Sequence, residues 1–295
     1  MAIEIRPLHP VFVGEVSGAD LCEPLGQPEV AAIEAGMDRY GVLVFHGQNI
    51  TDPQQIAFSR NFGEIELAVA GNVTKLEERR LPVEIADVSN LDQNNQVFAR
   101  NDRRRMFNLG NQLWHSDSSF RAIPAKYSLL SGRHVQTGVG NTEFCDMRAA
   151  YDDLDSATLA KIEDLVTEHS LIHSRGILGF ADFSEAEKQM FTPVRQRLVR
   201  THPVTGRKSL YLSSHAGTIV GWQMPEARAF LRDLIEHATQ DKYRYSHSWT
   251  QYDLVIWDNR QTMHRVRSFD ETLPRDMRRT TIAGTSPTVA QVLAA

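Results

Sequence analysis

Short apolar segments bounded by turn residues dominate this chain, and long amphipathic stretches are few. The run Val42–Phe45 is apolar throughout and predicts a buried central strand. A hairpin is expected around the turn at residues 203–206. The expected strands are two within Ile3–Val16, one within Val83–Val88, the segment around His115, and Tyr127–Ser131, Thr142–Asp146, Leu198–His202, Ser209–Ser213, Lys242–Trp249, Asp253–Trp257 and Arg278–Gly284.

A smaller number of segments have the helical spacing of apolar residues. In Glu29–Tyr40 the apolar positions fall on one helical face, and Gly41 is placed to end that helix. Thr51 is a capping residue followed by Asp52-Pro53, which predicts a helix start there and an end at Gly63. The other expected helices are Met147–Val166 with a break near Asp155, a short one within Ser184–Gln189, and Pro225–Thr239.

Many short strands, few long helices and no βαβ alternation favour a mainly β fold with helical insertions, a double-stranded β-helix or jelly roll. We expect one domain over residues 1–295. Residues 66–108 have the weakest pattern and carry charge clusters at 77–80 and 101–105. A long connection of this kind is often a lid or substrate loop, although a solvated surface loop fits the pattern equally well.

Composition excludes several classes of function. The 295 residues include 41% hydrophobic and 23% charged residues, as expected for a soluble globular protein. A net charge of −5 and the lack of a long basic run argue against a nucleic-acid partner. No apolar stretch is long enough to span a membrane, and the N-terminus lacks the apolar segment of a signal peptide. Cys22 and Cys145 are expected to be reduced thiols of a cytoplasmic protein.

The most informative stretch is Trp114–Phe120, which contains His115-Ser116-Asp117. In an extended strand residues i and i+2 face the same side, so His115 and Asp117 would present an imidazole and a carboxylate to one point. Those are two ligands of the 2-His-1-carboxylate triad that holds Fe(II) and leaves positions open. The alternative is a structural histidine–aspartate pair.

A third ligand must come from further along the chain, and His264 is the best candidate. It follows the apolar strand Asp253–Trp257 and a short turn, and Arg275 lies beyond it. Arginine grips a carboxylate through two parallel hydrogen bonds. On an alternating strand Arg279, four residues after Arg275, would share its face, and Arg278 would not. A solvated strand edge is the alternative for Arg278 and Arg279.

These motifs resemble the Fe(II)/2-oxoglutarate dioxygenases of the taurine dioxygenase family, and within it the enzymes that act on 2,4-dichlorophenoxyacetate. The resemblance runs from Leu8-His9-Pro10 to Arg279. It rests on His115-x-Asp117, Thr142 after a glycine turn, Trp257-Asp258-Asn259, His264, Arg275 eleven residues later, and the longer blocks at 111–120, 142–152, 198–202 and 206–208.

The resemblance implies a role for each matching residue. His115, Asp117 and His264 would bind Fe(II), and no catalytic residue beyond this metal centre is expected. Thr142 and Arg275 would hold the distal carboxylate of 2-oxoglutarate. Arg279 would bind the acidic group of the substrate. His202 is a candidate for the substrate pocket, with a hydrogen-bonded core histidine as the alternative; Trp114 and Trp257 are expected in the core.

The implied reaction uses O2 and 2-oxoglutarate to hydroxylate the methylene beside the ether oxygen of an aryloxyacetate. The products are a phenol and glyoxylate, with succinate and CO2. The herbicide enzymes carry lysines in the region that corresponds to residues 66–100, which is expected to shape the substrate pocket, whereas this chain has Lys75 alone there. Rivals are the same chemistry on an alkyl sulfonate or aryloxypropionate, a zinc hydrolase with the same ligands, and a non-catalytic jelly-roll binding module. We expect a small aromatic acid as the partner, and a homo-oligomer.

Overall fold

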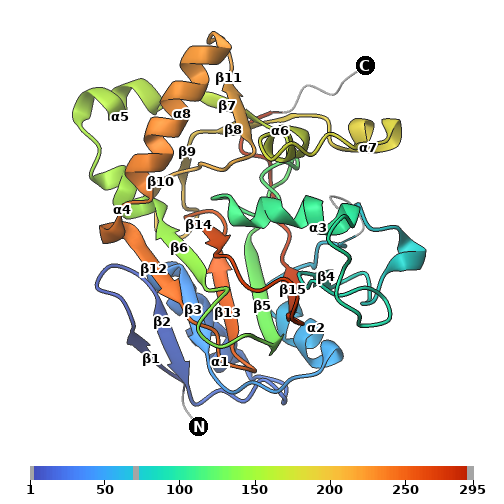
Figure 1. Ribbon diagram of the computed structural model, residues 1–295. Helices are drawn as coiled ribbons and strands as arrows, with labels where there is room; N and C mark the ends of the chain where they lie inside the picture. The colour runs from blue at the N-terminus through green and yellow to red at the C-terminus, as the bar shows by residue number, and fades with distance from the viewer. Residues whose placement is uncertain (1–2, 69–72, 291–295) are drawn as a thin grey trace.

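The computed structural model describes residues 3–68 and 73–290, and a large sheet lies at the centre of this part of the chain (Figure 1). Its seven strands have the order β1-β2-β3-β13-β5-β15-β4. β2 and β3 pair in parallel, and the other neighbours are antiparallel. The strands are β1 (Glu4–Pro7), β2 (Gly14–Ser17), β3 (Val42–Phe45), β4 (Ala86–Asp87), β5 (Tyr127–His134), β13 (Leu254–Asp258) and β15 (Asp276–Thr281).

Smaller sheets accompany this large one. One has the order β12-β6-β14, a second β11-β7-β8, and β9 pairs with β10. Their strands are β6 (Thr142–Asp146), β7 (Val166–His169), β8 (Val194–Arg197), β9 (Val199–Thr201), β10 (Lys208–Leu210), β11 (Ala216–Ile219), β12 (Arg244–His247) and β14 (Thr262–Val266).

The two faces of the large sheet contact different apolar clusters because side chains alternate along each strand. Val42 and Val44 of β3 pack with Phe144 of β6, which places that cluster between the large sheet and the β12-β6-β14 sheet. Leu43 and Phe45 point the other way, toward helices α1 (Gln27–Tyr40) and α2 (Asp52–Arg60). The β12-β6-β14 sheet is thereby held against the inner face of the large sheet.

Helices cover the outside of this arrangement. Thr51 caps α2 through a capping box with Gln54, and Gly41 ends α1 with a φ of 73°. α8 packs above the β12-β6-β14 sheet, while α1 and α2 lie beneath the large sheet (Figure 1). The helices are α1 (Gln27–Tyr40), α2 (Asp52–Arg60), α3 (Arg103–Asn108), α4 (Met147–Asp152), α5 (Ser156–Ile162), α6 (Leu171–Gly176), α7 (Glu185–Met190) and α8 (Met224–Ala238), with short 3-10 turns η1 (Leu76–Glu78), η2 (Leu109–Gln112) and η3 (Asp241–Tyr243).

The prediction of a mainly sheet fold with helices is confirmed, and several details differ. β2, α1 and β3 form one βαβ unit, which the sequence analysis did not expect. The segment around His115 is no strand: its backbone makes one isolated antiparallel bridge with His264. Val166 begins β7 instead of ending a helix. It follows Ile162 by four residues, a spacing that puts two side chains on one face in a helix and in a strand alike. Elements not expected at all are β8, β11, β14, α3 and α6.

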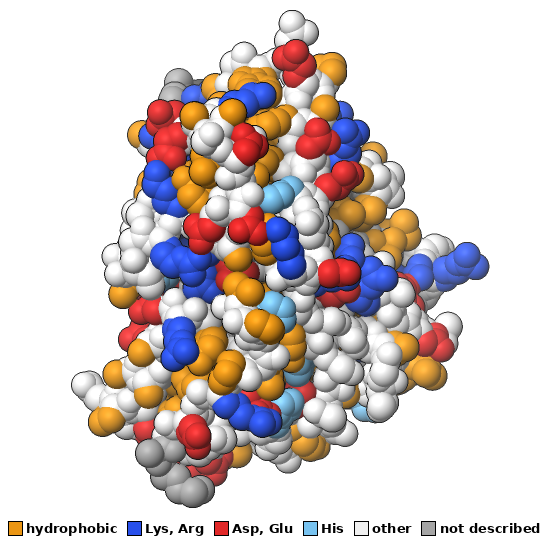
Figure 2. Space-filling model, turned by 90° about the vertical axis from the view of Figure 1, so that its left-hand side faces the viewer, with side chains coloured by type: hydrophobic (Ala, Val, Ile, Leu, Met, Phe, Trp, Pro, Cys, Tyr) orange, Lys and Arg blue, Asp and Glu red, His pale blue; other side chains and the backbone are white. Residues whose placement is uncertain are grey.

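The surface carries both signs of charge. Figure 2 shows acidic and basic side chains interspersed over one face of the molecule, as the composition suggests. In residues 3–68 and 73–290, none of the helices combines the length and the apolar character needed to cross a membrane.

Candidate metal and cosubstrate site

The structure brings His115, Asp117 and His264 together from two separate segments. One ligand atom from each lies within 4.8 Å of the others, and all three residues are buried. Nε2 of His115 is 3.8 Å from Asp117 Oδ1, and Nε2 of His264 is 3.6 Å from Asp117 Oδ2. No other such group of His, Cys, Asp or Glu occurs in the described ranges. Two imidazoles and one carboxylate converging on one point are the donor set of a facial triad.

The backbone fixes both histidines. His115 and His264 exchange two backbone hydrogen bonds of 3.0 and 2.9 Å, so their side chains leave the chain side by side. Nδ1 of His115 lies 2.7 Å from the Leu113 carbonyl, which can only accept. Nδ1 therefore carries the proton, and the Nε2 lone pair is left for a metal. Nδ1 of His264 is buried without a hydrogen-bond partner.

Asp117 is held by the Trp257-Asp258-Asn259 segment that ends β13. Asn259 Oδ1 accepts the Asp117 N–H at 3.0 Å and the Trp257 indole N–H at 3.1 Å. Its amide nitrogen donates to Ser128, whose hydroxyl donates to Asp117 Oδ2 at 2.7 Å. These hydrogen bonds orient the Asp117 carboxylate. The next residue, Ser118, has a positive φ of 55°.

The protonation states suit a cation. Burial lowers the pKa of His115 and lowers that of His264 well below its usual value, so both imidazoles are neutral and can donate a lone pair. Burial alone would raise the pKa of Asp117, but the charge of the Arg279 guanidinium, together with the hydrogen bond from Ser128, lowers it to about 2. An anionic carboxylate thus faces two neutral imidazoles.

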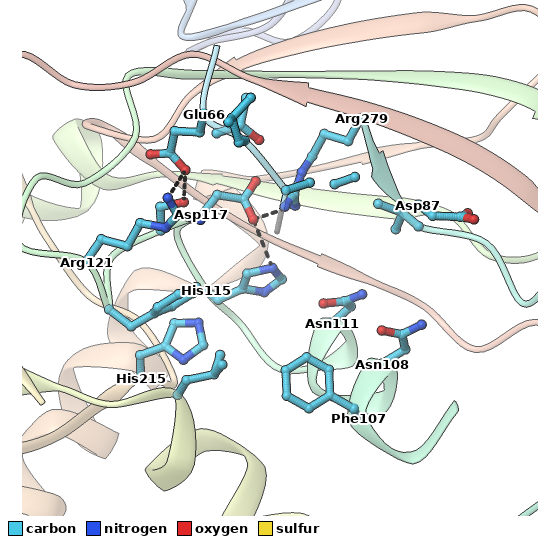
Figure 3. A pocket seen from close by; sticks show the side chains of 18 of the residues that line it. Glu66, Asp87, Phe107, Asn108, Asn111, His115, Asp117, Arg121, His215 and Arg279 are labelled. Carbon is cyan, nitrogen blue, oxygen red and sulfur yellow. Dashed lines mark hydrogen bonds and ion pairs between the residues drawn. The ribbon is translucent and has the colours of Figure 1, made fainter. Parts of the chain in front are cut away.

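Arg278 and Arg279 point to opposite faces of β15, as alternation predicts. Arg278 pairs with Asp52 of α2 at 2.8 Å on the outer face. Arg279 reaches inward and donates through Nη1 to Asp117 Oδ1 at 2.6 Å (Figure 3). Its Nε has no hydrogen-bond partner. Arg279 therefore lies beside a candidate metal ligand and has a buried N–H donor available for another group.

Arg275 and Thr142 both lie near the start of β6: Arg275 contacts Gly140, just before that strand, and Thr142 is its first residue. Nη2 of Arg275 donates weakly to the Gly140 carbonyl at 3.3 Å, and a side chain at Gly140 would come within 3.3 Å of the Arg275 Nε. The Arg275 side chain has no carboxylate partner among the described residues, and burial lowers its pKa to about 10. Thr142 Oγ1 accepts from the Trp249 indole at 3.0 Å, which leaves the hydroxyl proton for another acceptor. Each of these side chains therefore has a donor that an anion could accept.

Two pockets adjoin along this site. The first contains the metal-ligand candidates His115 and Asp117 together with Arg279, Phe107 and His215 (Figure 3). The second contains Arg275, Asn90 and Phe269. Val88, Asn108 and Asn111 line both. A cosubstrate held at Arg275 and a substrate near the triad would therefore be neighbours.

Residues 66–108 form much of the pocket wall. Glu66 and Ala86 line the first pocket, and Asn90 receives the Arg275 N–H through its side-chain oxygen at 2.8 Å. Arg80 is nearly buried and pairs with Asp276 at 2.7 Å. Residues 69–72 lie outside the described residues. The described part of this segment is attached to the rest of the fold at Arg80 by its ion pair with Asp276.

His202 lies elsewhere and requires a correction. It lines neither pocket; its Nδ1 accepts the backbone N–H groups of Val204 and Thr205, and its Nε2 lies 3.2 Å from Asp258 Oδ2. Both ring nitrogens are thus used in the core. The expected pocket residue is the hydrogen-bonded core histidine that the sequence also allowed.

Sequence reasoning missed three polar residues of the first pocket. Glu66, Arg175 and His215 line it, and each is buried or nearly so. Burial raises the pKa of Glu66 and lowers that of His215 well below its usual value. No motif marks these residues, since each is an isolated polar position on a separate segment. Only contacts between distant segments identify them.

Comparison with known proteins shows the family to which this chain belongs. The sequence model of the family described as "Taurine catabolism dioxygenase TauD, TfdA family" matches residues 4–281. An alpha-ketoglutarate-dependent 2,4-dichlorophenoxyacetate dioxygenase of Cupriavidus pinatubonensis is 45% identical over 95% of this chain and 98% of its own length. An (S)-phenoxypropionate/alpha-ketoglutarate-dioxygenase of Sphingobium herbicidovorans is 35% identical over 96% of each chain.

A solved structure is similar over nearly the whole chain. AAD-2, crystallised in complex with Mn(II) and N-oxalylglycine, matches with a TM-score of 0.95 and 61% identity. The match covers 98% of this chain and 100% of that one.

Proposed function

Since this chain belongs to the taurine catabolism dioxygenase TauD, TfdA family, we propose that it is an Fe(II)- and 2-oxoglutarate-dependent dioxygenase acting on an aryloxyacetate of the 2,4-dichlorophenoxyacetate type. One atom of O2 enters the methylene beside the ether oxygen, and the other enters succinate as 2-oxoglutarate loses CO2. The hydroxylated ether is a hemiacetal, which separates into a phenol and glyoxylate.

The observation that carries this proposal is the buried group His115, Asp117 and His264, together with Arg275 in the adjoining pocket, which has no carboxylate partner among the described residues. Two neutral imidazoles and one anionic carboxylate suit Fe(II), and His115, Asp117 and His264 would hold it. When bound, Fe(II) with 2-oxoglutarate supplies the oxidation of a C–H bond by O2. A zinc hydrolase could use the same three ligands but would have no use for Arg275.

The surrounding residues bind and orient. Arg275 and the free hydroxyl proton of Thr142 would hold the distal carboxylate of 2-oxoglutarate. Arg279, whose Nε lacks a partner, would bind the acidic group of the substrate. Holding that group one bond from the reacting methylene would direct the methylene toward the metal.

Several broader features belong to the same proposal. The large sheet facing the β12-β6-β14 sheet supports a double-stranded β-helix, and the continuous contacts support one domain over residues 1–295. Residues 66–108, which line both pockets, act as the substrate loop. We further propose a cytoplasmic protein that forms a homo-oligomer, with a small aromatic acid and no nucleic acid or membrane as its partner.

A succinate-release screen tests the function. Purified protein is given Fe(II), 2-oxoglutarate and, in parallel, aryloxyacetates, aryloxypropionates and alkyl sulfonates. We expect succinate and phenol in equal amounts with an aryloxyacetate, and neither product with Asp117→Ala. The phenoxypropionate relative makes an aryloxypropionate the second candidate. Succinate formed only with a sulfonate, or with none of the acids, contradicts the proposal.

A further inference from the structure

Arg175 is a buried cation that the fold leaves without an anion. It lies in α6 and is buried, with an exposed fraction of 6%. Its one side-chain hydrogen bond, from Nη1 to Ser174 Oγ, is long at 3.3 Å, and Nε has no partner. It forms no ion pair among the described residues, and the residues outside them contain no Asp or Glu.

A buried charge without a counterion is costly, so its presence needs a reason. Burial lowers the pKa of Arg175 to about 10, and no carboxylate acts to raise it. Arg275 has the same signature: it is buried, unpaired, and its pKa is lowered to about 10 by burial. Arg275 is the residue to which the proposed function already assigns a carboxylate. Arg175 has the same physical need for one.

The surroundings of Arg175 hold its guanidinium in one position. Its Cζ lies 4.5 Å from the centre of the Phe107 ring, a cation–π contact. On another side it lies against Gly110, where an added Cβ would meet the Arg175 Cζ at 2.1 Å. Gly110 belongs to η2, a few residues before His115. The fold thus makes room for this cation by leaving position 110 without a side chain.

Arg175 lines the pocket that contains the candidate metal ligands His115 and Asp117. Arg175 lines the first pocket together with His115 and Phe107, and its charge lowers the pKa of both His115 and His215. Three carboxylates of that pocket have other partners: Glu66 pairs with Arg121, Asp87 with Arg80, and Glu84 with Arg60. A metal at the triad would take the charge of Asp117. The pocket then has an excess of positive charge, in which an anionic ligand is favoured.

We propose that Arg175 is a second binding residue, beside Arg279, for the acidic group of the substrate. This inference rests on the proposed function and deepens it by assigning a specificity-determining residue. Arg175 lies on α6, and Arg279 on β15, so two distant segments would contribute to selection of an acid over a neutral aryl ether. The chemical class of ligand is a small carboxylate-bearing aryl ether.

The test compares an acid with its neutral counterpart. Wild type, Arg175→Met and Arg175→Lys are assayed with phenoxyacetate and with phenoxyacetamide at saturating Fe(II) and 2-oxoglutarate. For Arg175→Met we expect the KM for phenoxyacetate to rise about 30-fold or more, the loss typical of a charged contact. The KM values for the amide and for 2-oxoglutarate should stay within about twofold, and Arg175→Lys should recover part of the preference for the acid. The ratio of acid to amide is independent of the fraction of folded protein.

A binding measurement separates this inference from the proposed reaction. Calorimetry of phenoxyacetate with the protein loaded with Mn(II) and N-oxalylglycine requires no turnover. Arg175→Met should weaken that binding by the same factor, and Gly110→Ala, which displaces the guanidinium, should weaken it too. The exposed Arg232→Met on α8 is the control and should match wild type.

The outcomes are distinct. If wild type binds phenoxyacetate but Arg175→Met binds it equally well, the inference is overturned, whatever the activity screen shows. If Arg175→Met instead raises the KM for 2-oxoglutarate alone, Arg175 serves the cosubstrate and the inference is likewise wrong. If wild type binds phenoxyacetate through Arg175 yet releases no succinate, the proposed function fails and the binding role stands.

Discussion

Single residues at this site are distinguished by what the fold leaves unpaired. Arg278 and Arg279 are adjacent, yet one is used in an ion pair with α2 and the other contacts Asp117 in the pocket. Arg275 has no carboxylate partner in the described chain. The three arginines of one strand and its approach therefore have separate tasks, which substitution can separate.

Arg275→Met should raise the KM for 2-oxoglutarate, and Arg279→Met the KM for the aryloxyacetate. Losing a charge-assisted contact to a buried partner costs about 2–5 kcal/mol, or roughly 30-fold and upward in affinity. Arg279→Met should also consume 2-oxoglutarate faster than phenol appears, because a loosely held substrate is misplaced. Steady-state kinetics against both ligands measures these effects. Arg278→Met is the matched control and should leave both KM values unchanged. If Arg279→Met raises the KM for 2-oxoglutarate and leaves the KM for the aryloxyacetate unchanged, the assignment of the two arginines is reversed.

His202→Ala should destabilise the protein without changing the KM for the substrate. His202 bonds to the buried Asp258, and its removal leaves a cavity and a weakened partner. We expect a loss of about 2–3 kcal/mol in the free energy of unfolding, measured by urea denaturation. A large rise in substrate KM at unchanged stability would return His202 to the pocket.

At the scale of elements, β15 connects the site to the rest of the fold. Its inner face carries Arg279 and the buried Met277, and its outer face is tied to α2 by Arg278. Asp276, at its first position, pairs with Arg80 from the 66–108 segment. This ion pair fastens the pocket wall to the strand that positions Arg279.

The Arg80–Asp276 pair should make stability depend on acidity. Burial would raise the pKa of Asp276, but Arg80 and Arg278 lower it to about 2, below its value in the unfolded chain. Its contribution is therefore present near neutral pH and is lost as the pH falls from about 5 toward 2. Arg80→Met should cost about 1–2 kcal/mol at pH 7, after allowance for solvent screening, and less at pH 3. Thermal melts of both proteins across this range test it.

The control is Arg60→Met, whose arginine is largely exposed and 3.7 Å from Glu84. That variant should follow wild type at every pH. A difference between Arg80→Met and wild type that stays constant down to pH 2 would mean that Asp276 does not carry the effect.

For the whole molecule, the triad links segments that are about 150 residues apart in the chain. The unfolded chain cannot present His115, Asp117 and His264 at one point, so a metal held by these residues would bind the folded state preferentially. Folding and metal binding would therefore be coupled.

Adding Mn(II) or, without oxygen, Fe(II) to metal-free protein should raise its Tm. At a metal concentration about 100 times the Kd, the added stability is about 2.7 kcal/mol. The shift should disappear when the metal is chelated and should be absent in Asp117→Ala, whose metal content should also be near zero. An equal shift in Asp117→Ala would place the metal elsewhere. Melting curves and metal analysis provide the measurements.

The sequence by itself determined the features that depend on local spacing. The helix start after Thr51, the helical face of Glu29–Tyr40, the helix end at Gly41, and the strands Val42–Phe45 and Thr142–Asp146 follow from capping residues and apolar patterns that act over a few residues. Alternation along β15 was enough to separate Arg278 from Arg279. The candidate metal ligands came from motif spacing together with family resemblance.

Tertiary structure alone decided what depends on contacts between distant segments. His202 is a histidine like the candidate metal ligands, and the sequence allowed it in the substrate pocket. Its hydrogen-bond contact with the buried Asp258 places it in the core. Nothing in the sequence distinguishes Arg175 from the other arginines. In the fold it is buried against Gly110 and Phe107 without a counterion among the described residues. Burial and pairing are properties of the packed chain, because they arise from neighbours that no local pattern encodes.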